Sequence, residues 1–235
     1  MARYIERVRR FDTGQRIEHL VLVAGFVVLS ISGVPQKYPD SRWGEFFIGL
    51  MGGIERVRLI HHTAAIVLIL GTIYHLVAVA YKIYVKRVNL TMMPSVRDAQ
   101  DGIQTLAYNL HMSPTHPRMG RYTFGEKIEY WAVVWGTVIM IITGFVLWNP
   151  IATARLLPGE FIPSAKAAHG GEALLAILSI ITWHLYNVHI KHFNRSIFTG
   201  YMGRELMEEE HGLELAELEA GAGRATVDGV SFSSA

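Results

Sequence analysis

Four histidines recur at helical spacing on two apolar segments of the chain. His61 and His75 lie fourteen residues apart, and His169 and His184 lie fifteen apart. At a rise of ~1.5 Å per residue each interval spans roughly 21–23 Å of helix, and ~100° per residue returns both members to similar faces. A bis-histidine haem takes one imidazole from each of two facing helices. The spacing therefore predicts two haems stacked inside a helical bundle.

The elements that must position these histidines are four apolar windows. They are Ile17–Val34, Leu59–Val85, Tyr130–Trp148 and Ala167–Val188. Each has about the ~20 residues that an α-helix needs to cross the hydrocarbon of a bilayer. Of the 235 residues 51% are hydrophobic, and a soluble protein would rarely use four such windows for so small a core. The sequence predicts an all-α membrane protein, a bundle of four transmembrane helices.

The basic residues predict how the bundle is oriented. Fifteen of the 22 Lys and Arg residues lie before the first window, between the second and third, or after the fourth, and Lys82 at the inner end of the second window makes sixteen on one side. The positive-inside rule then places both termini on the cytoplasmic (inner) side of a bacterial or archaeal cytoplasmic membrane. Between helices two and three, residues 95–110 carry apolar side chains near helical spacing, which predicts a cytoplasmic amphipathic helix at the membrane surface. We expect a membrane domain of residues 1–205 and an acidic, then Gly-, Ala- and Ser-rich, flexible tail of residues 206–235.

Composition narrows the chemistry. The chain contains no cysteine, which excludes covalent c-type haem, cysteine-ligated iron–sulfur clusters and disulfides. A net charge of +2 gives no support to nucleic-acid binding. Ionisable side chains inside membrane helices are costly and therefore point to function. The alternative class is a four-helix transporter or scaffold whose histidines bind a metal or protons.

Depth in the membrane sorts the histidines into pairs. His61 and His169 each open a helix at the outer side, so we expect them to share an outer haem. His184 lies near the inner side, where His19 and His75 compete as its partner; spacing favours His75 without deciding. The other histidines are expected at the interfaces or in solvent, namely His62, His111, His116, His189, His192 and His211.

Several stretches resemble the di-haem cytochrome b family that includes the membrane subunits of respiratory formate dehydrogenase and nickel–iron hydrogenases. They are Arg16–His19, Arg58–His61, Gly125–Lys127, Thr143-Gly144, His169 and His184. The resemblance implies that His61 and His169 bind the outer haem b iron and that His19 and His184 bind the inner one. His75 then remains for a quinone site, or as the alternative inner ligand. Better-known members separate the last two ligands by fourteen residues, so the fifteen here predict a π-bulge or a rotated imidazole.

A narrower resemblance, to cytochromes b that work beside multihaem c-type cytochromes, rests on longer runs. These are Glu129–Trp148, His169–Ala173, Trp183–Tyr186 and Glu208–Leu215. It implies a subunit with two haem b groups that moves electrons between membrane quinone (menaquinone or ubiquinone) and a periplasmic multihaem c-type cytochrome or iron–sulfur subunit, within a larger membrane complex. The alternative is the quinone-reducing anchor of a formate dehydrogenase or hydrogenase. Near the outer haem we expect Glu172 at a second quinone site or hydrogen-bonded to a histidine or propionate, and Arg58 beside a propionate.

Overall fold

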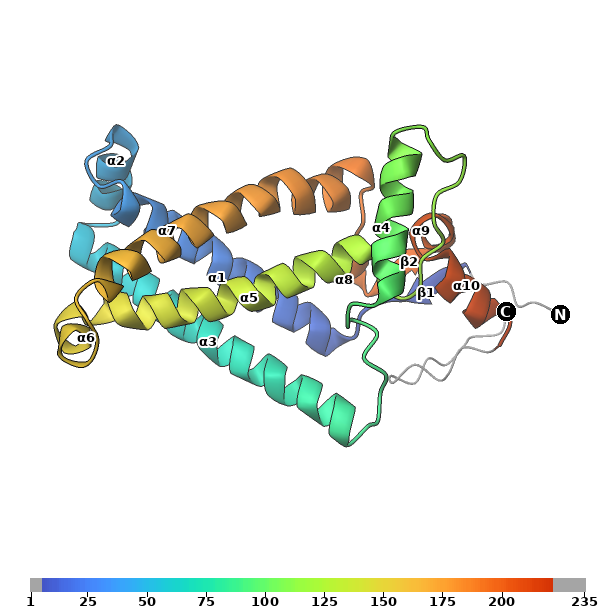
Figure 1. Cartoon of the computed structure of the whole chain (residues 1–235), viewed down its shortest axis with the longest axis horizontal. Coiled ribbons are helices and arrows are strands. Elements are labelled where there is room, and N and C mark those ends of the chain that lie inside the picture. The colour runs from blue at the N-terminus through green and yellow to red at the C-terminus, as the bar shows by residue number, and fades with distance from the viewer. Residues whose placement is uncertain (1–5, 222–235) are drawn as a thin grey trace. The chain divides into compact units, whose positions relative to one another are not determined.

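Four long apolar helices dominate the computed structural model, which describes residues 6–221 (Figure 1). They are α1 (Thr13–Lys37), α3 (Ile54–Tyr84), α5 (Phe124–Trp148) and a fourth that begins as α7 (Phe161–Ser179) and continues as the π-helices η1 (Ile180–His184) and η2 (Tyr186–Lys191). Each is long and apolar enough to cross a membrane. The prediction of four transmembrane helices is confirmed.

The contacts between residues divide the chain into two compact units. The first, which we call the span unit, comprises residues 17–77 and 132–193. The second, the terminal unit, comprises the described residues 6–16, 78–131 and 194–221.

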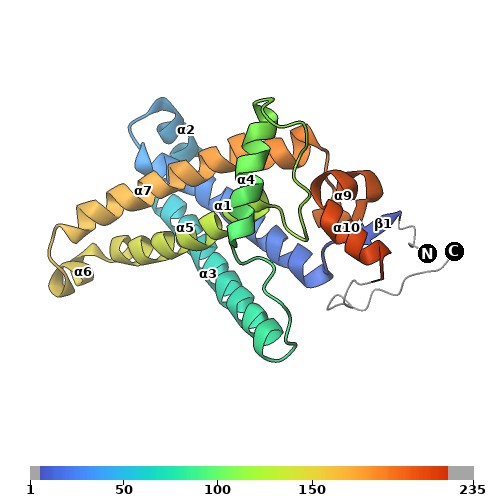
Figure 2. The ribbon, with the colours of Figure 1, turned by 45° about the vertical axis from the view of Figure 1, so that its right-hand side comes forward.

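Two short helices lie in the connections from α1 to α3 and from α5 to α7 of the span unit, where the sequence predicts loops. They are α2 (Arg42–Leu50) and α6 (Pro150–Leu156), found at the same end of this unit in both views (Figures 1 and 2). Capping explains where they begin. Ser41 Oγ accepts the backbone N–H of Gly44 at 3.0 Å, and Asn149 Oδ1 accepts that of Ala152, with a proline in the first helical position.

The four spanning helices turn most of their apolar surface outward. At most 11% of the residues in any of their apolar windows are buried against protein. Large side chains such as Leu70 and Ile142 are 60% exposed. Apolar surface on this scale is suited to contact with hydrocarbon rather than water.

The terminal unit is built around a two-stranded sheet that the sequence does not predict. Strand β1 (Arg7–Arg9) pairs antiparallel with β2 (Tyr201–Gly203), and Val8 lies opposite Met202. Helices α8 (Ser196–Thr199), α9 (Arg204–Glu210) and α10 (Gly212–Glu219) flank the second strand. Figure 2 shows α9 and α10 beside β1. The core of this unit consists of Val8, Met202, Met207 and Leu215.

Residues 206–219 therefore form folded helices, although the sequence assigns them to a flexible tail. Met207 is fully buried and Leu215 is 3% exposed, so these helices supply half of the small core. The expectation of flexibility for residues 222–235 concerns a part of the chain outside the described residues.

His211 is buried in the terminal unit, so the expectation that it is solvated is wrong. Its Nδ1 lies 2.9 Å from the carbonyl oxygen of Gly120, and its Nε2 lies 3.2 Å from Nη2 of Arg10. Because the guanidinium can only donate, Nε2 accepts and Nδ1–H donates to the carbonyl. Burial, followed by the charge of Arg10, lowers the pKa of His211 to about 4. The acidic residues around His211 suggest a segment exposed to solvent. One of them, Glu214, instead forms an ion pair with the buried Arg10.

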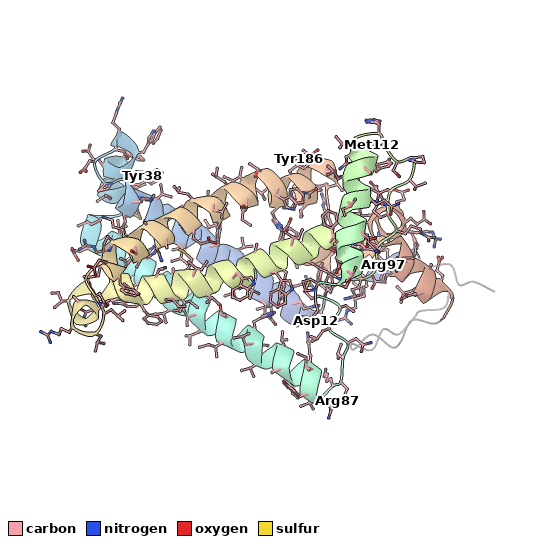
Figure 3. All side chains as sticks on the ribbon, viewed as in Figure 1. Asp12, Tyr38, Arg87, Arg97, Met112 and Tyr186 are labelled. Carbon is pink, nitrogen blue, oxygen red and sulfur yellow. The ribbon has the colours of Figure 1, made fainter. Side chains whose placement is uncertain are left out.

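Helix α4 (Val96–Asn109) lies between α3 and α5 in the sequence and belongs to the terminal unit. Asp98 accepts the backbone N–H of Ser95 at 2.6 Å, which caps the helix, and also binds Nζ of Lys127 at 2.7 Å. The opposite face is apolar and open, with Val96 79% and Ile103 71% exposed. Figure 3 labels Arg97 in the first turn of α4 and Met112 in the segment just after its last residue.

Candidate functional site: two histidine pairs

Two pairs of histidines face each other within the span unit. The ring centroids of His61 on α3 and His169 on α7 are 6.3 Å apart. Those of His19 on α1 and His184 on η1 are also 6.3 Å apart. Fifteen residues separate the pairs along the fourth helix, roughly 22 Å at the helical rise. The structure thus brings together the two pairs that the family resemblance implies.

The ring spacing fits a metal held between two imidazoles. A metal–nitrogen bond of about 2 Å, with ~1.2 Å from that nitrogen to the ring centre, puts two rings on opposite sides of one metal about 6 Å apart. Both pairs show this separation. They come from facing helices, as the ligands of a haem between two helices must.

Hydroxyl groups from the other two helices contact the outer pair. Ser32 Oγ on α1 lies 2.9 Å from Nδ1 of His61, and Thr143 Oγ1 on α5 lies 2.9 Å from Nδ1 of His169. With Nδ1 engaged, Nε2 is the nitrogen available to a metal. All four spanning helices therefore contribute to the outer site.

A glycine follows each of these hydroxyl residues and allows close approach of the imidazole. A Cβ at Gly33 would lie 3.1 Å from Cε1 of His61, and one at Gly144 would lie 3.5 Å from Cε1 of His169. The first distance is tighter than an ordinary van der Waals contact. A side chain at position 33 would require the His61 ring to shift by a few tenths of an ångström, so glycine fits the observed ring position best.

The fifteen-residue interval is accommodated by π-helix. The backbone N–H of Leu185 donates to the carbonyl of Ile180, an i→i+5 bond that defines a π-turn ending at His184. One wider turn takes up one extra residue, and His184 then faces His19. The predicted π-bulge is confirmed.

His75 has a different partner. Its Nδ1 lies 2.6 Å from Oε2 of Glu18, so the imidazole bridges α3 and α1. Glu18 directly precedes His19, which takes the position opposite His184. Spacing along the helix cannot distinguish these two arrangements, because His19 and His75 lie at similar depth.

Two further predicted residues have protein partners. Arg58 donates to Glu55 Oε1 at 2.7 Å on the exposed surface of α3. Glu172 approaches α5 where that helix has no side chain, since a Cβ at Gly136 would lie 2.5 Å from Oε1 of Glu172. Glu172 is thus close to α5, one helical turn after His169.

Several contacts near the site are not found by reasoning from the sequence. Lys37 places its ammonium over the fourth helix, where a Cβ at Gly170 would lie 2.5 Å from Nζ. The ring of His62 stacks on Trp148, with centroids 4.1 Å apart and planes inclined by 16°. Ser32 could have been found, because a hydroxyl residue followed by glycine occurs both there and at Thr143.

Known proteins similar to this chain have one kind of function. No protein-family profile matches it. It is 25% identical over 209 residues to the formate dehydrogenase cytochrome b556 subunit of Haemophilus influenzae, covering 87% of this chain and 81% of that one. It is 23% identical over 182 residues to the cytochrome b556(fdo) subunit of Escherichia coli formate dehydrogenase, covering 77% and 78%. With the nitrate-inducible cytochrome b556(Fdn) subunit of Escherichia coli it shares 19% identity over 202 residues, covering 86% and 87%.

The four apolar helices and these relatives define the class: the chain is a membrane cytochrome b, an electron-transport subunit of an oxidoreductase complex. The similarity extends over most of the length of both chains in each comparison. It supports a relationship with the cytochrome b subunits of formate dehydrogenase, and with it haem b as the cofactor.

Proposed function

We propose that the chain is a di-haem cytochrome b subunit that carries electrons across the cytoplasmic membrane, between the quinone pool and a periplasmic redox partner. One observation carries this proposal. Helices that can span a membrane hold two separate pairs of histidines, and in each pair the ring centroids are 6.3 Å apart. Their roughly 22 Å separation along the helix sets one site toward each side of the bilayer.

In this proposal His61 and His169 hold the outer haem iron, and His19 and His184 hold the inner one. The bound haems supply one-electron redox chemistry. The protein orients the imidazoles through hydrogen bonds to their Nδ1 atoms at the outer site and keeps water away from the irons. Lys37, beside the turn that carries His169, is the cation we assign to an outer propionate, in addition to Arg58.

The quinone, menaquinone or ubiquinone, is proposed to bind near the inner pair. There Glu18, which directly precedes the proposed ligand His19 on α1, contacts His75 of α3, and the two side chains offer hydrogen-bonding groups to a quinone oxygen. The periplasmic partner is proposed to be a multihaem c-type cytochrome or an iron–sulfur subunit. It would exchange electrons with the outer haem.

The orientation, with both termini in the cytoplasm, has two supports. Strand β1 precedes the first spanning helix, β2 follows the last, and the two strands pair. Paired segments lie on one side of a membrane, which agrees with an even number of crossings. The sixteen basic residues outside the outer connections favour the cytoplasm as that side.

Helix α4 is proposed to lie at the cytoplasmic surface of the membrane, with its open apolar face in the lipid. The Asp98–Lys127 ion pair holds its other face on the protein, and both side chains are mostly buried. Exposed apolar residues on one face of a helix bind the boundary between headgroups and acyl chains.

Because the chain has no cysteine, a single spin label tests this placement. A label at Ile103→Cys in membrane vesicles should be more accessible to oxygen than to a water-soluble nickel chelate. A label at Asn109→Cys, exposed on a different face, should show the reverse order. Equal nickel accessibility at both positions would place α4 in water.

Haem content tests the main proposal. A pyridine haemochrome assay on the purified complex, with a reduced-minus-oxidised spectrum, should give two b-type haems per copy of this chain. One haem would contradict the two-site arrangement. A chain without haem would favour the transporter or scaffold class.

The names of the relatives favour a second candidate function, that of the quinone-reducing anchor of a formate dehydrogenase. The two candidates differ in the partner and in the direction of electron flow. Formate-dependent reduction of the haems in native membranes would select the second.

A further inference from the structure

The outer site contains the same two-residue pattern twice, a hydroxyl residue followed by glycine. Ser32-Gly33 on α1 faces His61, and Thr143-Gly144 on α5 faces His169. In each case the hydroxyl contacts Nδ1 at 2.9 Å and the glycine lies against Cε1 of the same ring. The two copies of this pattern come from different helices and act on the two histidines of one pair.

The donors and acceptors of these contacts can be assigned. Ser32 Oγ lies 2.7 Å from the carbonyl oxygen of Val28, and Thr143 Oγ1 lies 2.6 Å from that of Ile139. A hydroxyl has one proton, and a carbonyl can only accept, so each proton is directed to the helix backbone. The hydroxyl oxygen must therefore accept from the imidazole. Both side chains are buried, Ser32 at 0% and Thr143 at 9% exposure, which leaves little access for water as a substitute partner.

We infer that Ser32 and Thr143 are positioning residues that hold His61 and His169 as Nδ1–H tautomers and thereby lower the reduction potential of the outer haem. This inference rests on the proposed function, because it assigns both histidines to one haem iron. Neither hydroxyl touches the iron. Each acts through the ring nitrogen remote from it.

The physical effect has a definite sign. A hydrogen bond from Nδ1–H to an oxygen increases the electron density that the ring presents at Nε2. A more basic ligand stabilises ferric iron more than ferrous iron, so the potential of the haem falls. The two hydroxyls contact different histidines of the same pair, so their effects on a haem held by that pair should reinforce each other.

Replacing either hydroxyl tests the inference in the purified complex. In Thr143→Val and in Ser32→Ala we expect two haems per chain and a potentiometric titration in which one of the two waves moves to more positive potential. We expect about a tenfold change in the ratio of oxidised to reduced haem at fixed poise, which is ~59 mV for one electron. The double variant should move the same wave further, and the other wave should stay in place.

Two matched variants separate hydrogen bonding from packing. Thr143→Ser keeps the hydroxyl and should titrate as the wild type. Thr72→Val removes a hydroxyl that makes the same backbone contact, to the carbonyl of Leu68 at 2.9 Å, and should move neither wave. Unchanged waves in both Thr143→Val and Ser32→Ala would overturn the inference, as would equal shifts in Thr143→Ser and Thr143→Val. Fewer than two haems in the wild type would instead refute the proposed function itself.

Discussion

Replacing His169 by alanine is expected to lower the haem content from two to one per chain, with loss of the outer haem alone. In the proposed arrangement the change would remove one of the two imidazoles that hold the outer haem iron, and the other, that of His61, lies on a different helix. The inner pair lies roughly 22 Å further along the fourth helix and keeps both its imidazoles. The measurement is the pyridine haemochrome content together with the reduced-minus-oxidised spectrum. The remaining haem serves as the internal test that the variant has folded.

The same assay separates the two candidates for the inner ligand. His19→Ala and His184→Ala should each remove the inner haem, whereas His75→Gln should retain both haems because His75 faces Glu18. A His75→Gln protein with one haem, beside a His19→Ala protein with two, would exchange the assigned roles. Survival of both haems in His169→Ala would refute the outer pairing.

Acidification from pH 7 to pH 4 is expected to weaken the terminal unit by about 3 kcal/mol through His211 alone. The pKa of His211 is lowered from 6.5 to about 4 in the folded protein. Above pH 6.5 the histidine is neutral in both the folded and the unfolded state, and its contribution to stability is complete. Between pH 6.5 and 4 the unfolded state binds a proton that the folded state does not, so stability falls as pH falls, by ~1.36 kcal/mol per unit of pKa difference.

Hydrogen exchange of the backbone amides in β1, β2 and α10 measures this loss, after correction for the intrinsic effect of pH on exchange. His211→Gln keeps a hydrogen-bonding side chain without a titrating ring, and its protection should change less over the same range. His116→Gln, a partly exposed histidine of the same unit, should behave as the wild type. An identical pH profile for His211→Gln and the wild type would rule out the buried imidazole as the cause.

The parts of the fold that depend on local pattern can be predicted from the sequence. The four spans follow from apolar length, and the grouping of histidines by depth follows from the helical rise. Even the π-turn before His184 can be anticipated, because an interval of fifteen residues does not return to the face that fourteen would reach. These inferences need no knowledge of what lies across the bundle.

The choice between His19 and His75 does need that knowledge. Both lie at the depth of His184, and what separates them in the structure is the contact of His75 with Glu18. The contact of Ser32 with His61 needs the same knowledge: the Ser-Gly pattern marks Ser32 as a candidate, but a serine in a membrane helix usually bonds the preceding turn, so the sequence does not say which histidine it contacts.

The folding of the terminal unit is the feature that composition fails to predict. The acidic run around His211 resembles a solvated tail, and strand β1 has only three residues. Their structure comes from pairing between segments at opposite ends of the chain. Such pairing leaves no periodic signal in either segment.

That pairing also bears on how the protein is made. Arg10 and Glu214 form an ion pair although 204 positions separate them in the sequence. Strand β1 can pair only after β2, which follows the last spanning helix, has been made. Contacts so distant in sequence form late, after the closure of everything between them. A nascent chain with three helices inserted still has β1 without its partner strand and Arg10 without Glu214. Completion of the terminal unit would thus mark the point at which synthesis and insertion of the whole bundle are finished.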